Sequence, residues 1–340
     1  MRIHFVTAAT KNGIGGGTTA WKNLLSKLFQ QVEITLHYPS DADGIWSEFL
    51  NPEIKHESHH DWLTYENRGY QNYDQNYKSF RFNAIPANSL VVLDSMEAVR
   101  QLVPGLAERN CQIYWHLQSP YRLPRRNLIF RFRDQNRLKK LKKIIAVSNF
   151  LKKVSTLDAK IVKTVYLGIP QADDAQRIDG KFPQKIGYFG RYEGYKNPLF
   201  LEKLAFESLY IGSIKGCTSP VNIPPEKDLG WLPVSEAVRL ADFFIFPCIE
   251  EAFGLSIIEL QAYGKICICF DSGAFPEIIE SGKNGFLVNP LDSDRVNAII
   301  SELQANPSLK QKIQNAAVES VKKYSLDSYA KNFIAAITDP

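Results

Sequence analysis

Two glutamates eight residues apart, Glu251 and Glu259, lie in the segment with the clearest chemical pattern. The apolar run 241–246 meets a proline and predicts a strand that stops there, and Gly254 lets the backbone approach a ligand closely. Helical spacing begins at Leu255, and the free N–H groups of a helix start can hold a phosphate. A carboxylate beside them accepts hydrogen bonds from hydroxyls. The combination predicts a ligand with phosphates and hydroxyls, as in a sugar nucleotide.

A second cluster lies upstream, where a short predicted strand ends at Gly190 and a loop carries Arg191 and Lys196. Pro198 can open a helix directly afterwards. An Arg fork and a Lys point charge suit a diphosphate. A leaving nucleoside diphosphate gains negative charge, so such cations stabilise the transition state of a transfer more than its ground state. The alternative is a pair of solvated surface cations.

The Glu-x7-Glu pattern around Phe-Gly-Leu and the Gly-Arg-x4-Lys element resemble the signature of family 4 glycosyltransferases. These are retaining enzymes of the GT-B fold and include bacterial polysaccharide and mannosyltransferase-like members. The resemblance implies that Glu251 contacts hydroxyls of the donor sugar, that Glu259 holds the ribose, and that Arg191 and Lys196 neutralise the diphosphate. It also implies that a stretch of backbone lies against the sugar and the diphosphate: Phe253, Gly254, Leu255 and Ser256.

A glycine-rich turn follows the strand predicted at 3–7 and leads into a helix, with its N–H groups close to any ligand there. Thr18 stands at the sixth position of the dinucleotide fingerprint, where Gly or Ala belongs. Glu33 lies at the distance of a ribose-binding acid, which keeps an NAD-linked enzyme as a minor alternative. The turn is not a P-loop either, because no Lys-Ser/Thr pair follows it at the required spacing. The family resemblance places such a loop near the donor phosphates and the acceptor: Gly15, Gly16 and Gly17.

His116 ends a predicted strand, and open α/β sheets bind ligands at the carboxyl ends of their strands. A lone His is otherwise more often structural. The segment is similar to a Tyr-x-His-x3-Pro-x-Arg stretch of bacterial family 4 enzymes, matched by Tyr114, His116, Pro120 and Arg122, with Gln-Ser before the proline. The resemblance implies that His116 belongs to the active site and lines the donor sugar near its C6 hydroxyl.

Alternating strand and helix patterns predict α/β layers. The resemblance implies a GT-B architecture of two Rossmann-like domains that face each other across a cleft, with a last helix that crosses back. We expect an acceptor-side domain at 1–168 plus the helix near 325–340, and a nucleotide-sugar domain at 171–324. The predicted strands are 3–7, 33–37, 89–94, 112–116, 143–147 and 163–167 in the first domain and 185–189, 208–212, 242–246, 266–270 and 286–288 in the second.

The composition is that of a soluble globular protein, since 44% of the 340 residues are apolar and 23% are charged. The sequence shows neither an apolar run of about 18 residues nor a signal peptide, so we expect a cytoplasmic protein. Five cysteines include no Cys-x-x-Cys motif. Cys267 and Cys269 alternate with apolar residues, which predicts small buried side chains on a strand and no disulfide or metal role.

Positive charge concentrates in the first half: residues 1–168 hold 24 Lys and Arg against 14 Asp and Glu. The stretch 122–143 holds ten basic residues and a single acid, Asp134. It is a candidate contact with anionic lipid at the inner membrane surface, which would bring the protein to a lipid-linked acceptor. A solvated helix face that helps attract an anionic donor is about as good an interpretation. We expect no nucleic-acid partner, because no motif of that class is present.

No metal or other cofactor is expected, since the cations Arg191 and Lys196 already serve a diphosphate. Asp41-Ala-Asp43 and Asp292-Ser-Asp294 resemble a metal-binding Asp-x-Asp but stand away from the phosphate elements. The cluster 56–61, which is rich in His, is interpreted as a polar loop rather than a zinc site. The tyrosines of 62–82 fit an acceptor surface or ordinary packing.

Together these features predict a retaining, metal-independent glycosyltransferase that moves a hexose from a GDP- or UDP-sugar to a glycan or lipid-linked acceptor. Retention in this family implies attack on the same face as the leaving group, with a donor phosphate oxygen taking the proton. The sequence shows no side-chain nucleophile or carboxylate pair at glycosidase spacing. Two alternatives stay open: a GT-B epimerase of sugar nucleotides, and a non-catalytic binder of nucleotide sugars or glycans.

Overall fold

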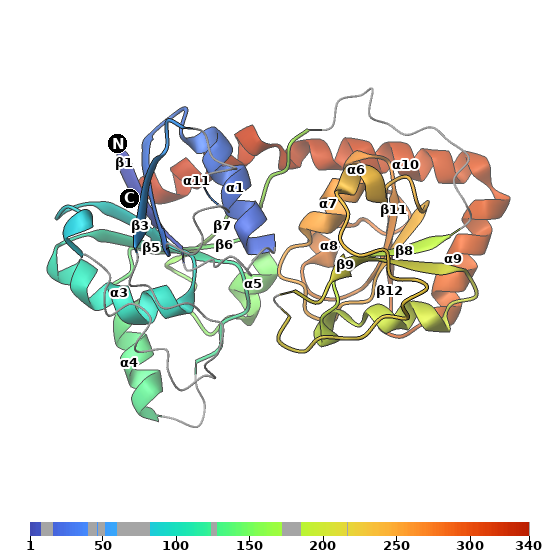
Figure 1. The fold of residues 1–340 in the computed structure, drawn as a ribbon, viewed down its shortest axis with the longest axis horizontal. Coiled ribbons are helices and arrows are strands. Elements are labelled where there is room, and N and C mark those ends of the chain that lie inside the picture. The colour runs from blue at the N-terminus through green and yellow to red at the C-terminus, as the bar shows by residue number, and fades with distance from the viewer. Residues whose placement is uncertain are drawn as a thin grey trace. The chain divides into compact units, whose positions relative to one another are not determined.

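The computed structural model describes residues 1–7, 16–39, 46, 52–59, 82–123, 128–171, 185–215 and 217–339. The chain divides into two compact units, which are coloured along the sequence in Figure 1. Unit 1 comprises Met1–Leu167 and Asp327–Pro340, and unit 2 comprises Gly168–Leu326. Each unit is a parallel sheet flanked by helices, as the alternating pattern predicts.

The sheet of unit 1 has the strand order β3-β2-β1-β4-β5-β6-β7, and every neighbouring pair is parallel. Its central strands β1, β4 and β5 are mostly buried because helices cover both faces of the sheet. Ile3, Phe5, Val91 and Val92 are accordingly fully buried. The strands are β1 (Arg2–Val6), β2 (Glu33–Pro39), β3 (Lys55–His59), β4 (Leu90–Leu93), β5 (Gln112–Leu117), β6 (Lys143–Ala146) and β7 (Val162–Thr164).

The last helix of the chain packs into unit 1. The Tyr114 hydroxyl on β5 donates to the carbonyl of Ile337 at 2.7 Å, and the rings of Phe5 and Phe333 stack at 6.0 Å. The crossing-back helix that the GT-B architecture requires is therefore confirmed. The helices of unit 1 are α1 (Gly16–Leu28), η3 (Phe82–Ala84), α3 (Met96–Glu108), α4 (Leu128–Leu138), α5 (Asn149–Val154) and α11 (Leu326–Thr338).

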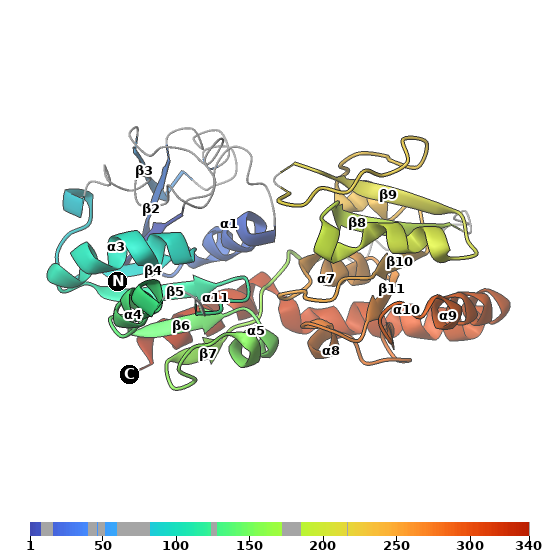
Figure 2. The same ribbon diagram turned by 90° about the horizontal axis from the view of Figure 1, so that it is seen from below.

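The sheet of unit 2 has the order β12-β11-β10-β8-β9 and is also parallel. Helix α10 packs on α7 and α9, an arrangement visible in Figure 2. The strands are β8 (Ile186–Arg191), β9 (Ser208–Ser213), β10 (Phe243–Phe246), β11 (Ile266–Phe270) and β12 (Phe286–Val288). The helices are η5 (Gly194–Lys196), η6 (Pro198–Lys203), α6 (Val234–Ala237), α7 (Leu255–Ala262), α8 (Phe275–Ile278), α9 (Ser293–Ala305), α10 (Pro307–Val321) and η7 (Lys322–Tyr324).

Each sheet has a point at which the order of the strands reverses. In unit 1 the chain runs outward from β1 to β3 and then returns to β4 on the other side of β1. In unit 2 it goes from β8 to β9 and returns to β10 on the other side of β8. Connections leave such a point in opposite directions and open a crevice at the carboxyl ends of the strands, where α/β proteins bind ligands.

All eleven predicted strands are present, but one strand was missed. Residues 56–59 of the cluster interpreted as a polar loop belong to β3, which pairs in parallel with β2 at the edge of the sheet. The interpretation was wrong because an edge strand with one covered side needs no apolar alternation to pair its backbone. The helix expected after Pro198 is a 3-10 helix. Cys267 and Cys269 are fully buried on β11 as predicted, and all five cysteines are free thiols.

Candidate functional site

The switch point of unit 2 holds an ion pair between Lys196 and Glu251. Lys196 ends the short helix that follows β8, and Glu251 lies in the loop that follows β10. Nζ of Lys196 and Oε2 of Glu251 are 2.7 Å apart, and the two side chains are 19% and 20% exposed. Asn197 turns the chain back immediately after the lysine, with a φ of 51°. The fold therefore brings together one predicted phosphate-binding cation and one predicted sugar-binding carboxylate.

Both members of the pair are charged at neutral pH. Burial lowers the pKa of Lys196, but the adjacent Glu251 carboxylate outweighs it and the net pKa lies above the ordinary value. Burial likewise raises the pKa of Glu251, whereas the Lys196 ammonium and the N–H groups of Ala252 and Phe253 bring it below the ordinary value. A charged pair held at a crevice is ready to exchange partners with a polar ligand.

A close backbone approach fixes the position of Glu251. Gly273, in the turn after β11, has a φ of 59°, and a Cβ atom there would lie 2.6 Å from the nitrogen and 2.7 Å from the oxygen of Glu251. The N–H of Ala274 donates to the same carbonyl at 2.9 Å. Sequence reasoning missed Gly273, although a glycine three residues after the end of a buried strand was a usable signal.

Gly254 and Glu259 frame the start of α7. Gly254 has a φ of 108° and caps the helix without a side-chain hydrogen bond. The N–H groups of the first turn of α7 are therefore available as donors to a ligand. Phe253 is buried edge-on against Tyr324, while Leu255 and Ser256 form the first turn.

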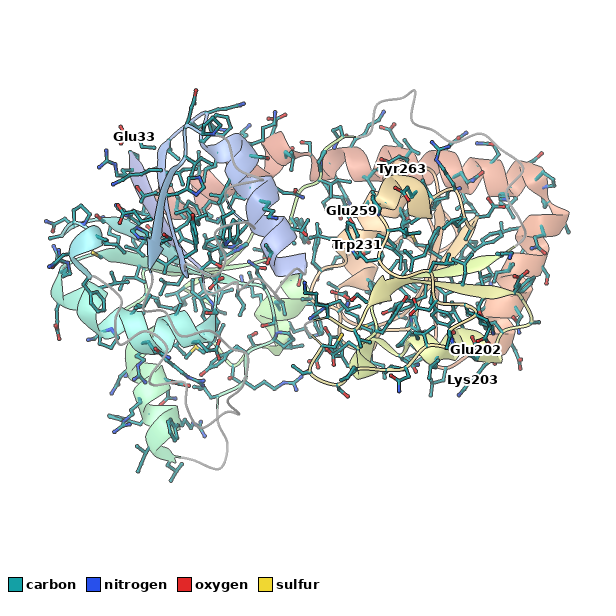
Figure 3. All side chains as sticks on the ribbon, viewed as in Figure 1. Glu33, Glu202, Lys203, Trp231, Glu259 and Tyr263 are labelled. Atoms are coloured by element: carbon teal, nitrogen blue, oxygen red, sulfur yellow. The ribbon has the colours of Figure 1, made fainter. Side chains whose placement is uncertain are left out.

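Glu259 lies one turn into α7 and is labelled in Figure 3. Burial raises the pKa of its carboxyl to about 7. No other described residue makes a hydrogen bond or ion pair with this carboxyl. A partly buried carboxyl without a partner costs stability, and a hydroxyl-bearing ligand would remove that cost.

Arg191 ends β8 beside the same cluster. The Tyr188 hydroxyl donates to the Arg191 carbonyl at 2.7 Å, which fixes the strand end. Burial raises the pKa of the neighbouring Tyr195 phenol, on which the charges of Lys196, Glu251 and Arg191 also act. The predicted basic pair and the first glutamate therefore share one neighbourhood.

Glu193, which sequence reasoning passed over, holds the loop that faces this cluster. Its carboxylate is buried and accepts the N–H groups of Thr218 at 2.9 Å and Ser219 at 2.5 Å. These bonds bring its pKa below the ordinary value although burial alone would raise it. An acidic residue two positions after the strand end gives no distinctive signal in sequence, because its partners lie about 25 residues away.

In unit 1, His116 lies one residue before the end of β5, where the sequence predicted the last residue of the strand, and its side chain is fully buried. The indole N–H of Trp21 donates to Nδ1 at 2.7 Å, and the Tyr329 hydroxyl lies 3.3 Å from Nε2. Burial lowers the pKa of His116 to about 3, so the ring is neutral at physiological pH. This environment suits a positioning role better than proton transfer, and the predicted contact with a donor sugar stays a prediction.

The glycine turn and the His116 segment meet within unit 1. A Cβ atom on Gly17 would lie 2.6 Å from Oε1 of Gln118, and the Gln118 amide is 2.9 Å from Nδ1 of His116. Gly16 opens α1, whereas Gly15 lies outside the described residues. At the switch point itself, Thr7 after β1 donates to Asp94 after β4.

Metal-site geometry is not found in the part of the chain that the structure describes, since no three His, Cys, Asp or Glu residues converge there. Asp292 caps α9 by accepting the N–H of Arg295 at 2.9 Å, a structural task. Asp41, Asp43 and the tyrosines of 62–82 fall outside the described residues.

Among the described helices, none combines the length and apolarity needed to span a membrane.

Residues 229–320 match the family model of glycosyl transferases group 1, a segment that includes Glu251, Gly254, Glu259 and Gly273. Sucrose-phosphate synthase 4 of Arabidopsis thaliana is 27% identical over 101 residues, which are 30% of this chain and 10% of that protein. A sucrose synthase of Denitrovibrio acetiphilus is 34% identical over 96 residues, or 27% of this chain and 12% of that protein. The chain thus spans about a tenth of the length of these relatives.

Solved structures match over both units. HepE of Anabaena, solved in complex with UDP-glucose, has a TM-score of 0.76 at 15% identity, with all of both chains covered. The chain has the GT-B fold. The sucrose-phosphate synthase of Thermosynechococcus elongatus matches with a TM-score of 0.74 at 14% identity, covering 98% of this chain and 97% of that one. At such identities the likeness establishes architecture alone.

Proposed function

We propose that this protein is a retaining glycosyltransferase that moves a hexose from a UDP- or GDP-sugar to a glycan or lipid-linked acceptor without a metal. The observation that carries the proposal is the Lys196–Glu251 pair at the unit 2 switch point, within hydrogen-bond distance at 2.7 Å. It lies beside a helix start with free donors and a helix that bears the unpartnered Glu259. The family match over 229–320 and the UDP-glucose bound by HepE support the same reading.

In this proposal Arg191 and Lys196 bind the diphosphate, aided by the N–H groups of Gly254, Leu255 and Ser256. Lys196 is released from Glu251 as it meets phosphate, and Glu251 turns to hydroxyls of the donor sugar. Lys196 then contacts the phosphate and Glu251 contacts the sugar hydroxyls, so neither buried charge is left without a polar partner. Glu259 accepts the ribose hydroxyls. In unit 1, His116 is neutral and is held by the Trp21 indole, which suits a positioning role.

Trp231 offers an aromatic face for the base. Its side chain is 66% exposed, and the preceding Gly230 accepts the N–H of Gly212 at 2.8 Å, which places the tryptophan near the carboxyl end of β9. In Figure 3 it is labelled in the same unit as Glu259. An exposed indole stacks on either a purine or a pyrimidine, so it does not select between GDP and UDP.

The proposed reaction needs no nucleophile from the chain. The acceptor hydroxyl attacks C1 of the hexose on the face that the diphosphate leaves, so a bond forms between C1 and the acceptor oxygen as the bond between C1 and the phosphate oxygen breaks. The acceptor proton passes to an oxygen of the departing phosphate. The cations stabilise the charge that develops on the nucleoside diphosphate, and they do so more in the transition state than before it.

The test is a thermal-shift panel of UDP, GDP, ADP and their glucose and mannose derivatives, with EDTA present. A ligand at a hundred times its dissociation constant adds about 2.7 kcal/mol to the free energy of unfolding. We expect UDP- or GDP-compounds to raise the melting temperature of the wild type and of Arg295→Ala, a matched exposed arginine on α9, but not of Arg191→Ala. No shift with any compound would contradict the proposal.

Release of nucleoside diphosphate distinguishes the enzyme from a binder. Transfer to methanol as a surrogate acceptor, followed by anomeric analysis of the methyl glycoside, should give the retained anomer. Stabilisation without any release over days, with candidate acceptors present, would favour a non-catalytic nucleotide-sugar binder. A changed sugar still attached to the nucleotide would favour an epimerase.

A further inference from the structure

The first half of α4 exposes large apolar side chains. Leu128 is 73%, Ile129 67% and Phe132 64% exposed, and Phe130 is about half exposed. At 100° per residue, Leu128, Ile129 and Phe132 fall within about a third of the helix circumference. Isolated exposed apolar residues are ordinary, but several in one helical turn and a half mark an interaction site.

The second half of α4 is firmly anchored in unit 1. Asp134 is fully buried and receives a forked bond from Arg100 on α3, with Nη2 to Oδ2 at 2.8 Å and Nε to Oδ1 at 3.2 Å. The Tyr121 hydroxyl donates to the same carboxylate at 2.9 Å. Leu138 is also buried, so the helix is held at its C-terminal end and its first six residues extend into solvent. Figure 1 shows α4 extending away from α3 and the sheet.

The anchoring changes the charge that this surface presents. The stretch 122–143 contains a single acid, and that acid, Asp134, is buried and neutralised by Arg100 and Arg137. Arg131, Arg133, Lys139 and Lys140 are exposed and make no ion pair with any described residue. The outward surface of α4 therefore combines apolar side chains with uncompensated positive charge.

We propose that the exposed half of α4, residues 128–133, inserts into the headgroup region of an anionic lipid surface and docks the protein there. Apolar area buried among acyl chains and attraction of Arg and Lys to anionic headgroups are the two forces that hold interfacial helices. Arginine side chains next to the apolar ones can lie along the helix and reach the headgroups. This inference rests on α4 alone and stands or falls independently of sugar transfer.

The first experiment is co-sedimentation with vesicles of phosphatidylcholine alone or with 30 mol% phosphatidylglycerol, using the full chain. We expect binding to the anionic vesicles at least tenfold tighter than to the neutral ones. The triple variant Leu128→Ser/Ile129→Ser/Phe132→Ser should bind the anionic vesicles at least tenfold more weakly. These residues are exposed, so its melting temperature should match the wild type. Wild-type affinity in this variant, or no vesicle binding by the wild type, would overturn the proposal.

The second experiment compares two double variants that each remove two positive charges. Arg131→Gln/Arg133→Gln should remove much of the preference for anionic vesicles, whereas Lys312→Gln/Lys331→Gln, exposed lysines on α10 and α11, lowers the net charge equally and should bind as the wild type does. Equal losses in both double variants would mean that net charge alone acts, against a docking helix. Tight binding of duplex DNA or RNA that the apolar substitutions leave unchanged would assign the surface to nucleic acid and refute the lipid proposal.

Discussion

The two units share an architecture but use their polar residues differently. At the switch point of unit 2, Lys196 and Glu251 are charged, partly exposed and paired with each other. In unit 1, His116 is sealed among Trp21, Tyr329 and Phe333 and is neutral. Both parallel sheets have a switch point at the carboxyl ends of their strands. The side chains at that point decide whether it holds a charged pair or a packed interior.

The largest effect should come from breaking the unit 2 pair. Lys196→Met leaves Glu251 as an uncompensated, largely buried carboxylate, which should cost roughly 3 kcal/mol of stability. Transfer should fall by at least about a hundredfold, because a diphosphate cation is lost. Urea denaturation and release of nucleoside diphosphate measure the two effects.

The double variant Lys196→Met/Glu251→Gln is its control. With no charge left unpaired it should recover most of the stability, but it should recover none of the transfer activity. If activity returned with stability, the pair would be structural, and the contrast between the two units would disappear.

A smaller effect is expected at the glycine that supports Glu251. Gly273→Ala forces a Cβ against the Glu251 backbone and should cost about 2–3 kcal/mol, including the strain of a positive φ. Gly282→Ala is a matched control, because Gly282 also has a positive φ, 80°, but a Cβ there would meet nothing within 4 Å. Its cost should stay near 1 kcal/mol.

The affinity for the nucleotide sugar provides a second comparison of the two glycine variants. Gly273→Ala should weaken nucleotide-sugar binding in isothermal titration by displacing Glu251, while Gly282→Ala should bind as the wild type does. Equal stability losses in the two variants would show that backbone conformation, and not the contact with Glu251, sets the requirement for glycine.

The smallest effect is a pH response of opposite sign in the two units. The folded-state pKa of His116, about 3, lies below the ordinary 6.5, so the unfolded chain binds the extra proton and stability falls as the pH drops below about 6.5. The folded-state pKa of Glu259, about 7, lies above the ordinary 4.5, so the folded chain keeps its proton and stability falls as the pH rises from 4.5 to 7.

Variants separate the two contributions. His116→Asn keeps a hydrogen-bond acceptor for Trp21. At pH 5 it should remove the loss of about 2 kcal/mol in the free energy of unfolding that protonation of His116 in the unfolded chain causes. Glu259→Gln should be more stable than the wild type at pH 8 by roughly 1–2 kcal/mol, since the carboxyl is only partly buried. Hydrogen exchange of peptides from each unit, corrected for intrinsic rates, assigns each response. A response of the same sign in both units would contradict the assignment.

The sequence by itself determined the strands and their order along the chain. Apolar runs such as 242–246 and 266–270 are long enough, and bounded clearly enough, to predict buried parallel strands, and both are present. It also placed Lys196 and Glu251 in loops after strands and Glu259 near a helix start, because residue type and local spacing carry that information, whereas Arg191, expected in the loop, is the last residue of β8. The polar edge strand β3 escaped because only its backbone pairing with β2 defines it.

Only the tertiary structure decided which of these residues meet. Lys196 and Glu251 are 55 residues apart, and their contact follows from the reversal of strand order that sets β8 beside β10. The same holds for Gly273 against Glu251, for the burial of His116, and for Asp134, whose burial leaves α4 without an exposed acidic residue. Local sequence encodes the elements, whereas burial and partners are properties of segments brought together from distant parts of the chain.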